Sequence, residues 1–338
     1  MSDRRESWNR REFVQLTLAG TAGLLGLQAE QGAAEPPPET RKLTLLNRPI
    51  LCVAPQYVAE ELLQGEGFDE VRYLKVPLEG VEPALASGEA DLSMVYVPPA
   101  VARIDAGDPI VLVAGVHVGC IEVLGNDRVR TVSDLKGKTI LTNKVGGPGY
   151  LFLASILAHV GLNPNRDVKW AVHPDLSDWE RLFVEGKVDA VLVAPPLVQQ
   201  IRARKVGRVV LNTGTDRPWS QYFCCAMVAN REFVQKHPVA TKRALRAILK
   251  ATNLCALEPE RVARFLVDKG YIERSDYAVQ SMKDVPYGKW REYDPADAVR
   301  FYALRLHEAG LIKSSPQKIL AQGTDWRFFN ELKKELKG

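Results

Sequence analysis

Two stretches of the chain share one plan, and together they decide the fold. The first, residues 88–101, reads GEADLSMVYVPPAV, and the second, residues 186–198, reads GKVDAVLVAPPLV. Each begins with glycine, has an aspartate three residues later, continues through an apolar run and then reaches two prolines. The spacing from aspartate to the prolines differs by one residue, so the stretches echo each other without forming a strict repeat.

Each stretch predicts a helix, a strand and a second helix in that order. The glycine ends a helix, because positive φ costs glycine little. The apolar run is typical of a buried strand in a parallel sheet. Proline cannot continue a strand ladder but suits the first turn of a helix. Two such units predict two α/β lobes that face each other across a cleft, although short motifs also match by chance.

Composition and charge narrow the function classes. The chain has 338 residues, 46% hydrophobic and 25% charged, which suits two globular α/β domains. The net charge of +4 is spread along the chain without a basic stripe, so we expect no nucleic-acid partner. The five cysteines lack a Cys-x-x-Cys spacing, which argues against a disulfide framework and a zinc module.

The first 34 residues have the pattern of an export signal. Residues 9–15 read NRREFVQ, and a mild apolar run with three glycines follows over residues 16–27. This pattern resembles a twin-arginine signal, and the apolar run is too short to span a bilayer. We therefore expect a periplasmic protein whose mature chain begins near Glu35. An uncleaved amphipathic helix is the alternative.

The rest of the chain is strand-rich first and helical later. A strand over residues 219–228 is expected to cross back from the second lobe. After it we expect helices over residues 231–235, 239–257, 259–269, 294–309 and 326–336, since each break carries a glycine, a proline or a capping residue. The C-terminal third then has no sheet of its own and is expected to pack on the first sheet.

Several motifs give the assembled pattern a family resemblance. They read ASGEAD at residues 86–91, TVSDLKGKTI at 131–140, GKVDA at 186–190, NREF at 230–233 and HP at 237–238. Over residues 42–310 the chain resembles type II periplasmic solute-binding proteins of ABC transporters, in particular the nitrate, sulfonate and taurine group. The resemblance implies α/β lobes, each a mixed, mostly parallel sheet flanked by helices, with a helical C-terminal tail.

The resemblance also implies how the chain divides and works. Lobe I would comprise residues 41–124 and 226–338, and lobe II residues 125–225. The two crossings would act as hinges, and closure on a ligand would present a surface to a membrane permease. We accordingly expect a monomer that binds and delivers a small anionic organic solute and catalyses nothing. A sensor kinase in place of the permease stays open.

The glycine-rich loop VGGPGY at residues 145–150 is the most chemical feature of the sequence. Glycines let backbone N–H groups approach a ligand, and the following helix offers its positive end. Gly146, Gly147 and Tyr150 are therefore candidates for binding a sulfonate, carboxylate, phosphate or nitrate group. The loop lacks the Gly-Lys-Ser/Thr of a nucleotide-binding loop, which argues against ATP. A plain strand-to-helix turn is the alternative.

Further candidates follow from the rule that open α/β sheets bind ligands at the carboxyl ends of their strands. The family's binding positions fall on the same loops. These loops carry several aromatic side chains and few acids, which suggests a ligand with an apolar or aromatic body and an anionic head. Aromatic residues, however, pack in the core about as often as they line a binding site. Glu122 is the one acid near these loops. The candidates are Gln56, Tyr57, Tyr96, Pro98, His117, Gly119, Cys120, Pro195, Trp219, Tyr222 and Cys224.

Two other readings concern the cysteines. His117, Cys120, Cys224 and Cys225 would converge on a metal if their strands were neighbours, but buried cysteine usually only packs, so we expect neither a metal nor a cofactor. The group also includes a hydroxymethylpyrimidine synthase of thiamine synthesis, which depends on a Cys-rich motif, a histidine and pyridoxal phosphate. A thiamine-pathway pyrimidine-binding protein or synthase is therefore the alternative function, against which the export signal argues.

Overall fold

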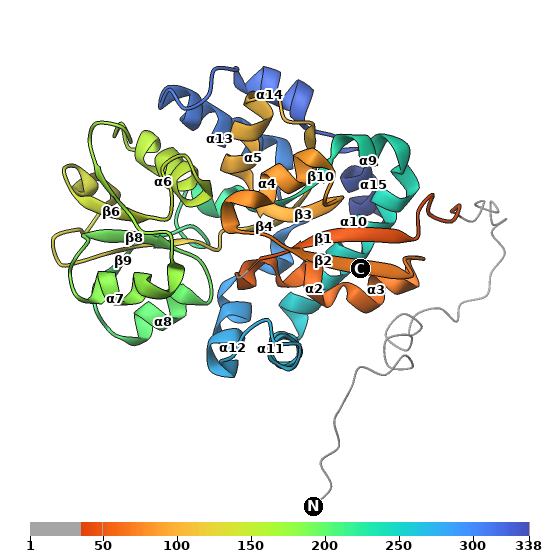
Figure 1. The fold of residues 1–338 in the computed structure, drawn as a ribbon, viewed down its shortest axis with the longest axis horizontal. Helices are drawn as coiled ribbons and strands as arrows, with labels where there is room; N and C mark the ends of the chain where they lie inside the picture. Colours follow the sequence, from red (N-terminus) through yellow and green to blue (C-terminus); the bar gives the residue numbers. More distant parts are fainter. Residues whose placement is uncertain (1–34, 49, 338) are drawn as a thin grey trace, which may run out of the picture. The chain divides into compact units, whose positions relative to one another are not determined.

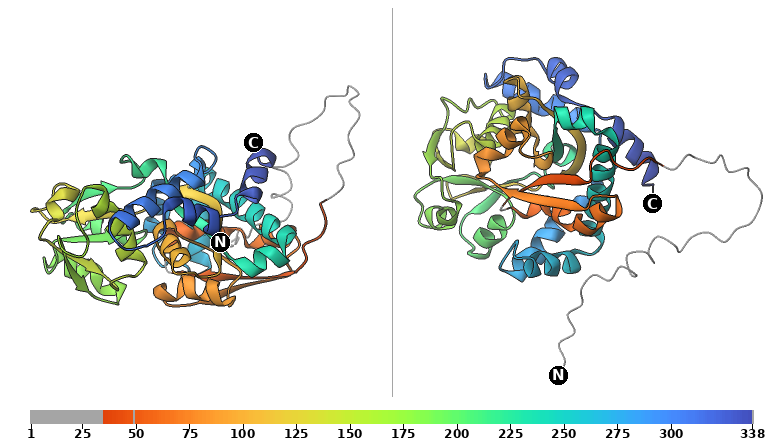
Figure 2. Two further views of the ribbon diagram at one scale, coloured as in Figure 1. Left: turned by 90° about the horizontal axis from the view of Figure 1, so that it is seen from above. Right: turned by 45° about the vertical axis from the view of Figure 1, so that its right-hand side comes forward.

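The computed structural model describes residues 35–48 and 50–337, so the predicted export signal at residues 1–34 lies outside the described residues. Two five-stranded sheets form the framework (Figure 1). In Figures 1 and 2 the yellow-to-green strands of the second sheet stand apart from the red and orange strands of the first. Helices flank both sheets, which confirms the predicted fold class.

The first sheet has the strand order β2-β1-β3-β10-β4. Strands β1, β2 and β3 run parallel, whereas β10 is antiparallel to both β3 and β4. The sheet thus takes β10 from a segment far along the chain. Its strands are β1 (Lys42–Asn47), β2 (Glu70–Lys75), β3 (Leu92–Tyr96), β4 (Ile110–Val118) and β10 (Phe223–Asn230).

The second sheet repeats this topology, with the order β7-β6-β8-β5-β9. Here β6, β7 and β8 run parallel, and β5 is antiparallel to β8 and β9. The second sheet begins with β5, a few residues before the lobe limit expected at residue 125, while all of β10 belongs to the first sheet. Its strands are β5 (Glu122–Gly125), β6 (Thr139–Thr142), β7 (Lys169–Val172), β8 (Ala190–Val193) and β9 (Arg208–Asn212).

The sequence echo has a structural cause in its two aspartates. Asp91 precedes β3, and its Oδ2 accepts a hydrogen bond from Thr44 N of β1 at 2.7 Å, while its own N–H donates to Thr44 O at 2.9 Å. Asp189 precedes β8 and makes the same two bonds with Thr139 of β6, at 2.9 and 2.8 Å. Each aspartate therefore joins the start of its strand to the neighbouring parallel strand.

The flanks of the two units also follow the predicted plan. Gly88 ends helix α4 (Val81–Ser87) with φ of 79°, and Gly186 follows α7 (Trp179–Val184) with φ of 68°. After β3 the prolines lie in the first turn of α5 (Val97–Asp105), and after β8 they directly precede α8 (Leu197–Ala203). The predicted order of helix, strand and helix is confirmed in both.

The sequence predicts that the C-terminal helices pack on the first sheet. In the structure they pack both on elements around the first sheet and on elements around the second, which we call the two halves of the molecule. α10 contacts α2 and α15 contacts β4, but α13 also packs on α6 and α12 on α8. The sequence analysis missed α12 and α14. The remaining helices are α2 (Ala54–Val58), α3 (Glu60–Gly65), α6 (Pro148–His159), α9 (Arg231–Lys236), α10 (Pro238–Leu257), α11 (Pro259–Asp268), α12 (Ser275–Asp284), α13 (Pro295–Glu308), α14 (Pro316–Gly323) and α15 (Arg327–Glu335).

The hydrophobic core has a large part and a small part. The large part is continuous from the first sheet to residues of β6 and β8. The small part lies between the second sheet and helices α7 and α8, and includes Trp179 and Phe183. Among the described helices, none is both long and apolar enough to cross a membrane.

Candidate functional site

A cavity of about 690 Å³ lies where segments that follow the strands of both sheets meet. Three lining residues belong to the part of the chain that builds the first sheet, and the others to the part that builds the second. Apolar side chains dominate the walls. The lining consists of Ile50, Leu78, Tyr96, Asn143, Gly149, Pro174, Asp175, Leu176, Ser177, Trp179, Leu192, Val193, Ala194, Pro195, Pro196, Leu197 and Gln200.

The second sheet supplies its share from the carboxyl ends of parallel strands. Asn143 follows β6, residues 174–177 follow β7 and residues 194–196 follow β8, while Gly149 lies in the first turn of α6. Parallel strands end at one edge of a sheet, which is where open α/β folds bind ligands. The cavity therefore occupies the position that the topology favours.

The polar groups in the walls largely serve the protein itself. Asn143 Nδ2 donates to Glu79 Oε1, Asp175 Oδ1 accepts from Ser177 N at 2.9 Å, and Trp179 Nε1 donates to the carbonyl of residue 173 at 3.0 Å. None of the lining residues, all in the described part of the chain, is lysine or arginine. These lining residues therefore offer a negatively charged ligand no side-chain cation, and Asp175 adds a carboxyl group to the wall.

Hydrogen bonds join the two halves around the cavity. Leu51 N, after the first sheet's β1, donates to Pro195 O at 2.9 Å. Arg202 Nη1 and Gln199 Nε2 of α8 reach Asp284 Oδ2 of α12 at 3.2 and 3.1 Å. Arg202 and Asp284 are exposed, whereas Leu51 and Gln199 are buried.

Glu122 lies outside the cavity, in a neighbouring crevice that it shares with Gly119, Cys120 and Pro195. Its Oε1 accepts from Arg202 Nη1 at 3.2 Å and from Asn212 Nδ2 at 3.1 Å. Burial raises the pKa of Glu122 to about 7, although the positive charge of Arg202 opposes this. Glu122 thus connects β5 to α8 and does not face the space where a ligand fits.

Of the candidates predicted from sequence, Tyr96 and Pro195 line the cavity. Gly147 caps the start of α6, and Gly149, two residues later, lines the cavity. Gly146 has φ of 79° in the turn before the helix. The hydroxyl of buried Tyr150 donates to Asn165 Oδ1 at 2.7 Å.

Gln56 and Tyr57 are buried and serve the first sheet. Gln56 Nε2 donates to Leu46 O at 2.5 Å, and its Oε1 accepts from Met94 N at 3.0 Å, so the side chain bridges β1 and β3. The Tyr57 hydroxyl accepts from Arg48 N at 2.7 Å and donates to Arg48 O at 2.9 Å. Both side chains hold the backbone where β1 ends.

The other aromatic candidates and Pro98 are engaged in packing. Trp219 is buried with its ring centroid 5.0 Å from that of His159, and Tyr222 stacks on Phe301 at 4.2 Å. Pro98 is buried in the first turn of α5. A ligand contact for these residues stays a prediction.

Gly119 lies where the chain leaves β4 for the second sheet. It has φ of 36°, and a Cβ atom there would lie 2.2 Å from the backbone of Thr213 and Gly214. The position therefore requires glycine because two backbone segments cross closely. His117, Cys120 and Cys224 lie beside this crossing, and β4 and β10 are neighbours, which was the condition for their convergence.

The sequence analysis missed most of the lining residues that come from the part of the chain building the second sheet, including Trp179 and Gln200. The signal was the loop between β7 and α7, since the strand-end rule applies to it as well. It also missed Cys52, whose side chain joins the His117 and Cys120 group.

Residues 37–266 match the sequence model of the NMT1-like family. The chain belongs to the NMT1-like family. This NMT1-like chain is 23% identical over 258 residues to a 4-amino-5-hydroxymethyl-2-methylpyrimidine phosphate synthase of Saccharomyces cerevisiae, THI13, covering 70% of this chain and 72% of the yeast protein.

Solved structures share the fold of this NMT1-like protein. The periplasmic nitrate-binding protein NrtA from Synechocystis PCC 6803 has a TM-score of 0.73 at 18% identity, covering 89% of this chain and 90% of that one. The alkanesulfonate-binding protein SsuA from Xanthomonas axonopodis pv. citri, bound to MOPS, has a TM-score of 0.66 at 18% identity, covering 83% and 96%. The resemblance predicted from the sequence is confirmed at the level of family and fold.

Proposed function

We propose that this protein is the substrate-binding component of an ABC transporter, which captures a small organic solute with an anionic group and delivers it to a membrane permease. The observation that carries the proposal is the cavity itself, whose walls come from both halves of a periplasmic binding protein fold. The hydrogen bonds around it, such as Leu51 to Pro195, join the halves without filling the cavity. The predicted export signal supports a periplasmic location.

The cavity favours an organic ligand over a bare inorganic anion. Binding sites for small organic molecules commonly measure about 300–1,000 Å³, and this cavity of about 690 Å³ lies within that range. Nitrate would leave most of it empty. Tyr96 and Trp179 offer aromatic surface to a ligand body, and the first turn of α6 at Gly149 offers backbone amides to a sulfonate or carboxylate.

A pyrimidine of the thiamine pathway is the second candidate, which the yeast relative at 23% identity does not favour over the first. That relative matches 70% of the chain, and the apolar cavity would also suit an aromatic ring. A pyrimidine binder would keep the same fold and cavity, so ligand identity separates the candidates. A synthase would in addition convert its ligand.

A thermal-shift screen of the purified chain tests the proposal. The panel contains nitrate, alkyl and aryl sulfonates, taurine, aromatic carboxylates, pyrimidines and pyridoxal phosphate. A ligand that binds only the folded state raises Tm by mass action. We expect a rise with an organic sulfonate or carboxylate and no turnover by mass spectrometry. A rise with pyrimidines or pyridoxal phosphate alone would move the assignment to the second candidate.

Matched tryptophan variants then place the ligand. Trp179→Ala removes cavity wall and should weaken binding by about 10–100-fold, the loss expected for one large buried contact. Trp170→Ala is the control, because Trp170 packs on Tyr150 outside the cavity lining. Gly149→Leu should also block binding, since its side chain would extend from the cavity wall. Equal affinity in Trp179→Ala and Trp170→Ala would reject the cavity as the binding site.

A further inference from the structure

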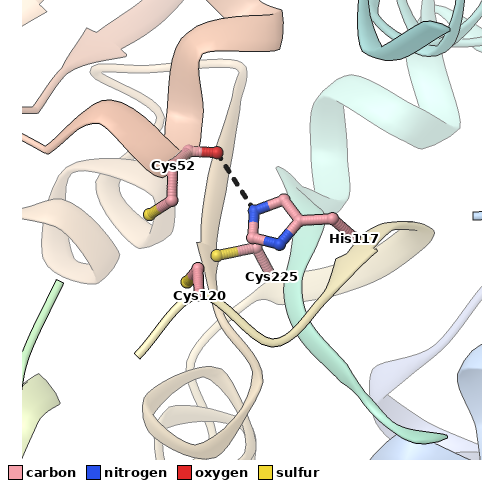
Figure 3. Close-up of side chains that lie close together, drawn as sticks. All are labelled: Cys52, His117, Cys120 and Cys225. Carbon is pink, nitrogen blue, oxygen red and sulfur yellow. Dashed lines mark hydrogen bonds between the residues drawn. The ribbon is translucent and has the colours of Figure 1, made fainter. Parts of the chain in front are cut away.

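Four buried side chains gather beside Gly119, in the connection that leads from β4 to β5. They are Cys52 after β1, His117 in β4, Cys120 in that connection and Cys225 in β10. Their sulfur and ring-nitrogen atoms all lie within 4.8 Å of one another. Figure 3 shows the three sulfur atoms gathered beside the imidazole ring. Cys225 and His117 are also partners in the β4–β10 register, which holds their side chains together.

The donor set is that of a tetrahedral site for a thiophilic metal. Three cysteine sulfurs and one imidazole nitrogen form one of the common structural zinc sites. Zinc–sulfur bonds of about 2.3 Å in a tetrahedron place the sulfurs about 3.8 Å apart. With a largest separation of 4.8 Å, the four donors need to move inward by about 1 Å or less.

The surroundings of His117 suit a metal ligand. One ring nitrogen, Nε2, lies 3.0 Å from Cys52 O, and the other, Nδ1, lies 3.2 Å from Val118 O. A metal-binding histidine commonly donates its second ring N–H to a backbone carbonyl, which sets the orientation of the ring. A neutral imidazole has one N–H, which can donate to one of these carbonyls and leaves the other nitrogen without a proton and able to bind a metal.

A buried positive charge lies near the four donors. Arg48 is buried; its Nη1 donates to Met94 O at 2.7 Å, but Nε and Nη2 have no hydrogen-bond partner among the described residues. The groups on which its charge acts are Tyr96, Glu82, Cys52 and Cys225. Zinc with three thiolates and a neutral imidazole carries one negative charge, which Arg48 would balance. The carboxyl of Glu82 also lies near Arg48, and burial raises the pKa of Glu82 although the charge of Arg48 opposes this.

We propose that Cys52, His117, Cys120 and Cys225 form a binding site for one thiophilic metal ion, with Zn²⁺ as the expected occupant. The ion would tie the segment after β1 to β4, to β10 and to the crossing toward the second sheet. The site adjoins the cavity through Tyr96, whose hydroxyl lies 3.9 Å from Cys52 Sγ and whose side chain lines the cavity wall. This inference does not depend on the proposed transport function.

Cobalt substitution of the full chain tests the site directly. The reduced chain, with its five thiols counted under denaturing conditions, is titrated with Co²⁺ and then with Zn²⁺. We expect one cobalt ion per chain, with intense visible bands of tetrahedral cobalt and sulfur-to-metal charge transfer in the near ultraviolet, both lost when Zn²⁺ displaces it. X-ray absorption of the zinc-loaded chain should fit three sulfurs and one nitrogen.

Cysteine variants identify the ligands. Cys120→Ser and Cys225→Ser should each weaken binding by more than about 100-fold, since loss of an outer partner alone costs about 10–100-fold. Cys255→Ser is the matched control, because Cys255 is equally buried but lies in α10 outside the group. Cys224 is a separate case, since its Sγ lies 3.0 Å from Cys120 Sγ. Cys224→Ser should retain the cobalt spectrum.

Three outcomes would overturn the proposal. The first is a reduced wild-type chain that binds no Co²⁺ or Zn²⁺, and the second is a zinc shell of oxygen and nitrogen without sulfur. The third is equal binding by Cys225→Ser and Cys255→Ser. The first two are measured on the wild-type chain, so the test stands even where a variant fails to fold.

Discussion

The two aspartates that echo in the sequence should respond oppositely to pH. Asp189 accepts hydrogen bonds from Thr139 N and Asn126 Nδ2, both at 2.9 Å, and from Arg128. Burial opposes its ionisation, but these donors outweigh it and lower the pKa of Asp189. For Asp91 burial prevails over the single bond from Thr44 N, and the pKa of Asp91 is raised.

Asparagine substitutions make this difference in pKa measurable as a change in the free energy of unfolding. Asp189→Asn keeps an acceptor for Thr139 N but loses the charge-assisted bonds, so it should lower the free energy of unfolding at neutral pH by about 1–3 kcal/mol. Asp91→Asn should cost less than about 1 kcal/mol at neutral pH, because it also removes the penalty of burying a charge. Asp91→Asn is thus the matched control.

The signs of the pH dependence follow from linkage. Asp189 has a lowered pKa when folded, so its contribution is present above the unfolded value of about 3.9 and is lost as the pH falls through the folded value. Asp91 has a raised pKa when folded, so its contribution is present below about 3.9 and is lost as the pH rises through the folded value. Acidification should therefore shrink the effect of Asp189→Asn and enlarge that of Asp91→Asn.

Urea unfolding followed by circular dichroism, from about pH 7 down to about pH 3.5, measures both effects. The wild-type chain is unfolded under the same conditions as the reference. If both variants show the same sign of pH dependence, or if Asp91→Asn costs more than Asp189→Asn at neutral pH, the electrostatic reasoning is wrong.

Two further predictions concern the crossing and the contacts between the halves. Gly119→Ala should lower the free energy of unfolding by more than about 3 kcal/mol, because its Cβ would force two backbone segments apart. Gly107→Ala is the control: Gly107 has φ of 93° but lies in open space, so this change should cost only about 1–2 kcal/mol. Equal losses of the two variants in urea unfolding would contradict this reasoning. Asp284→Ala removes the acceptor of Arg202 and Gln199 and should change the free energy of unfolding of the unliganded chain by less than about 1 kcal/mol. It should reduce the Tm rise given by a bound ligand, and a full rise would show that these contacts play no part in closure.

Local patterns predicted the helix–strand–helix units well. Gly88 and Gly186 follow helices because a residue with positive φ is needed there. The prolines at 98 and 99 lie in the first turn of α5 and those at 195 and 196 directly precede α8, again for reasons confined to a few residues. In the C-terminal region α12 and α14 were missed, although the capping residue Ser315 and the first-turn residue Pro316 are a typical start signal at α14.

The candidate site was predicted only in part. The strand-end rule located Tyr96 and Pro195, which line the cavity, and the glycine pattern located the loop before α6, whose Gly149 lines it too. It also selected Gln56 and Tyr57, which follow β1 but turn inward to hold the backbone of β1 and β3. A sequence pattern shows that a residue follows a strand, but not whether its side chain points to the cavity or into the core.

The sequence by itself determined the two α/β units, their strand-end loops and the helical C-terminal region, because periodicity, turn residues and helix caps act within a few residues of one another. Only the tertiary structure decided that β10 lies between β3 and β4, which places Cys225 beside His117. The cavity walls and the position of Cys52 depend on the same long-range pairing. Residues more than a hundred positions apart meet there through sheet register and packing, which no local pattern encodes.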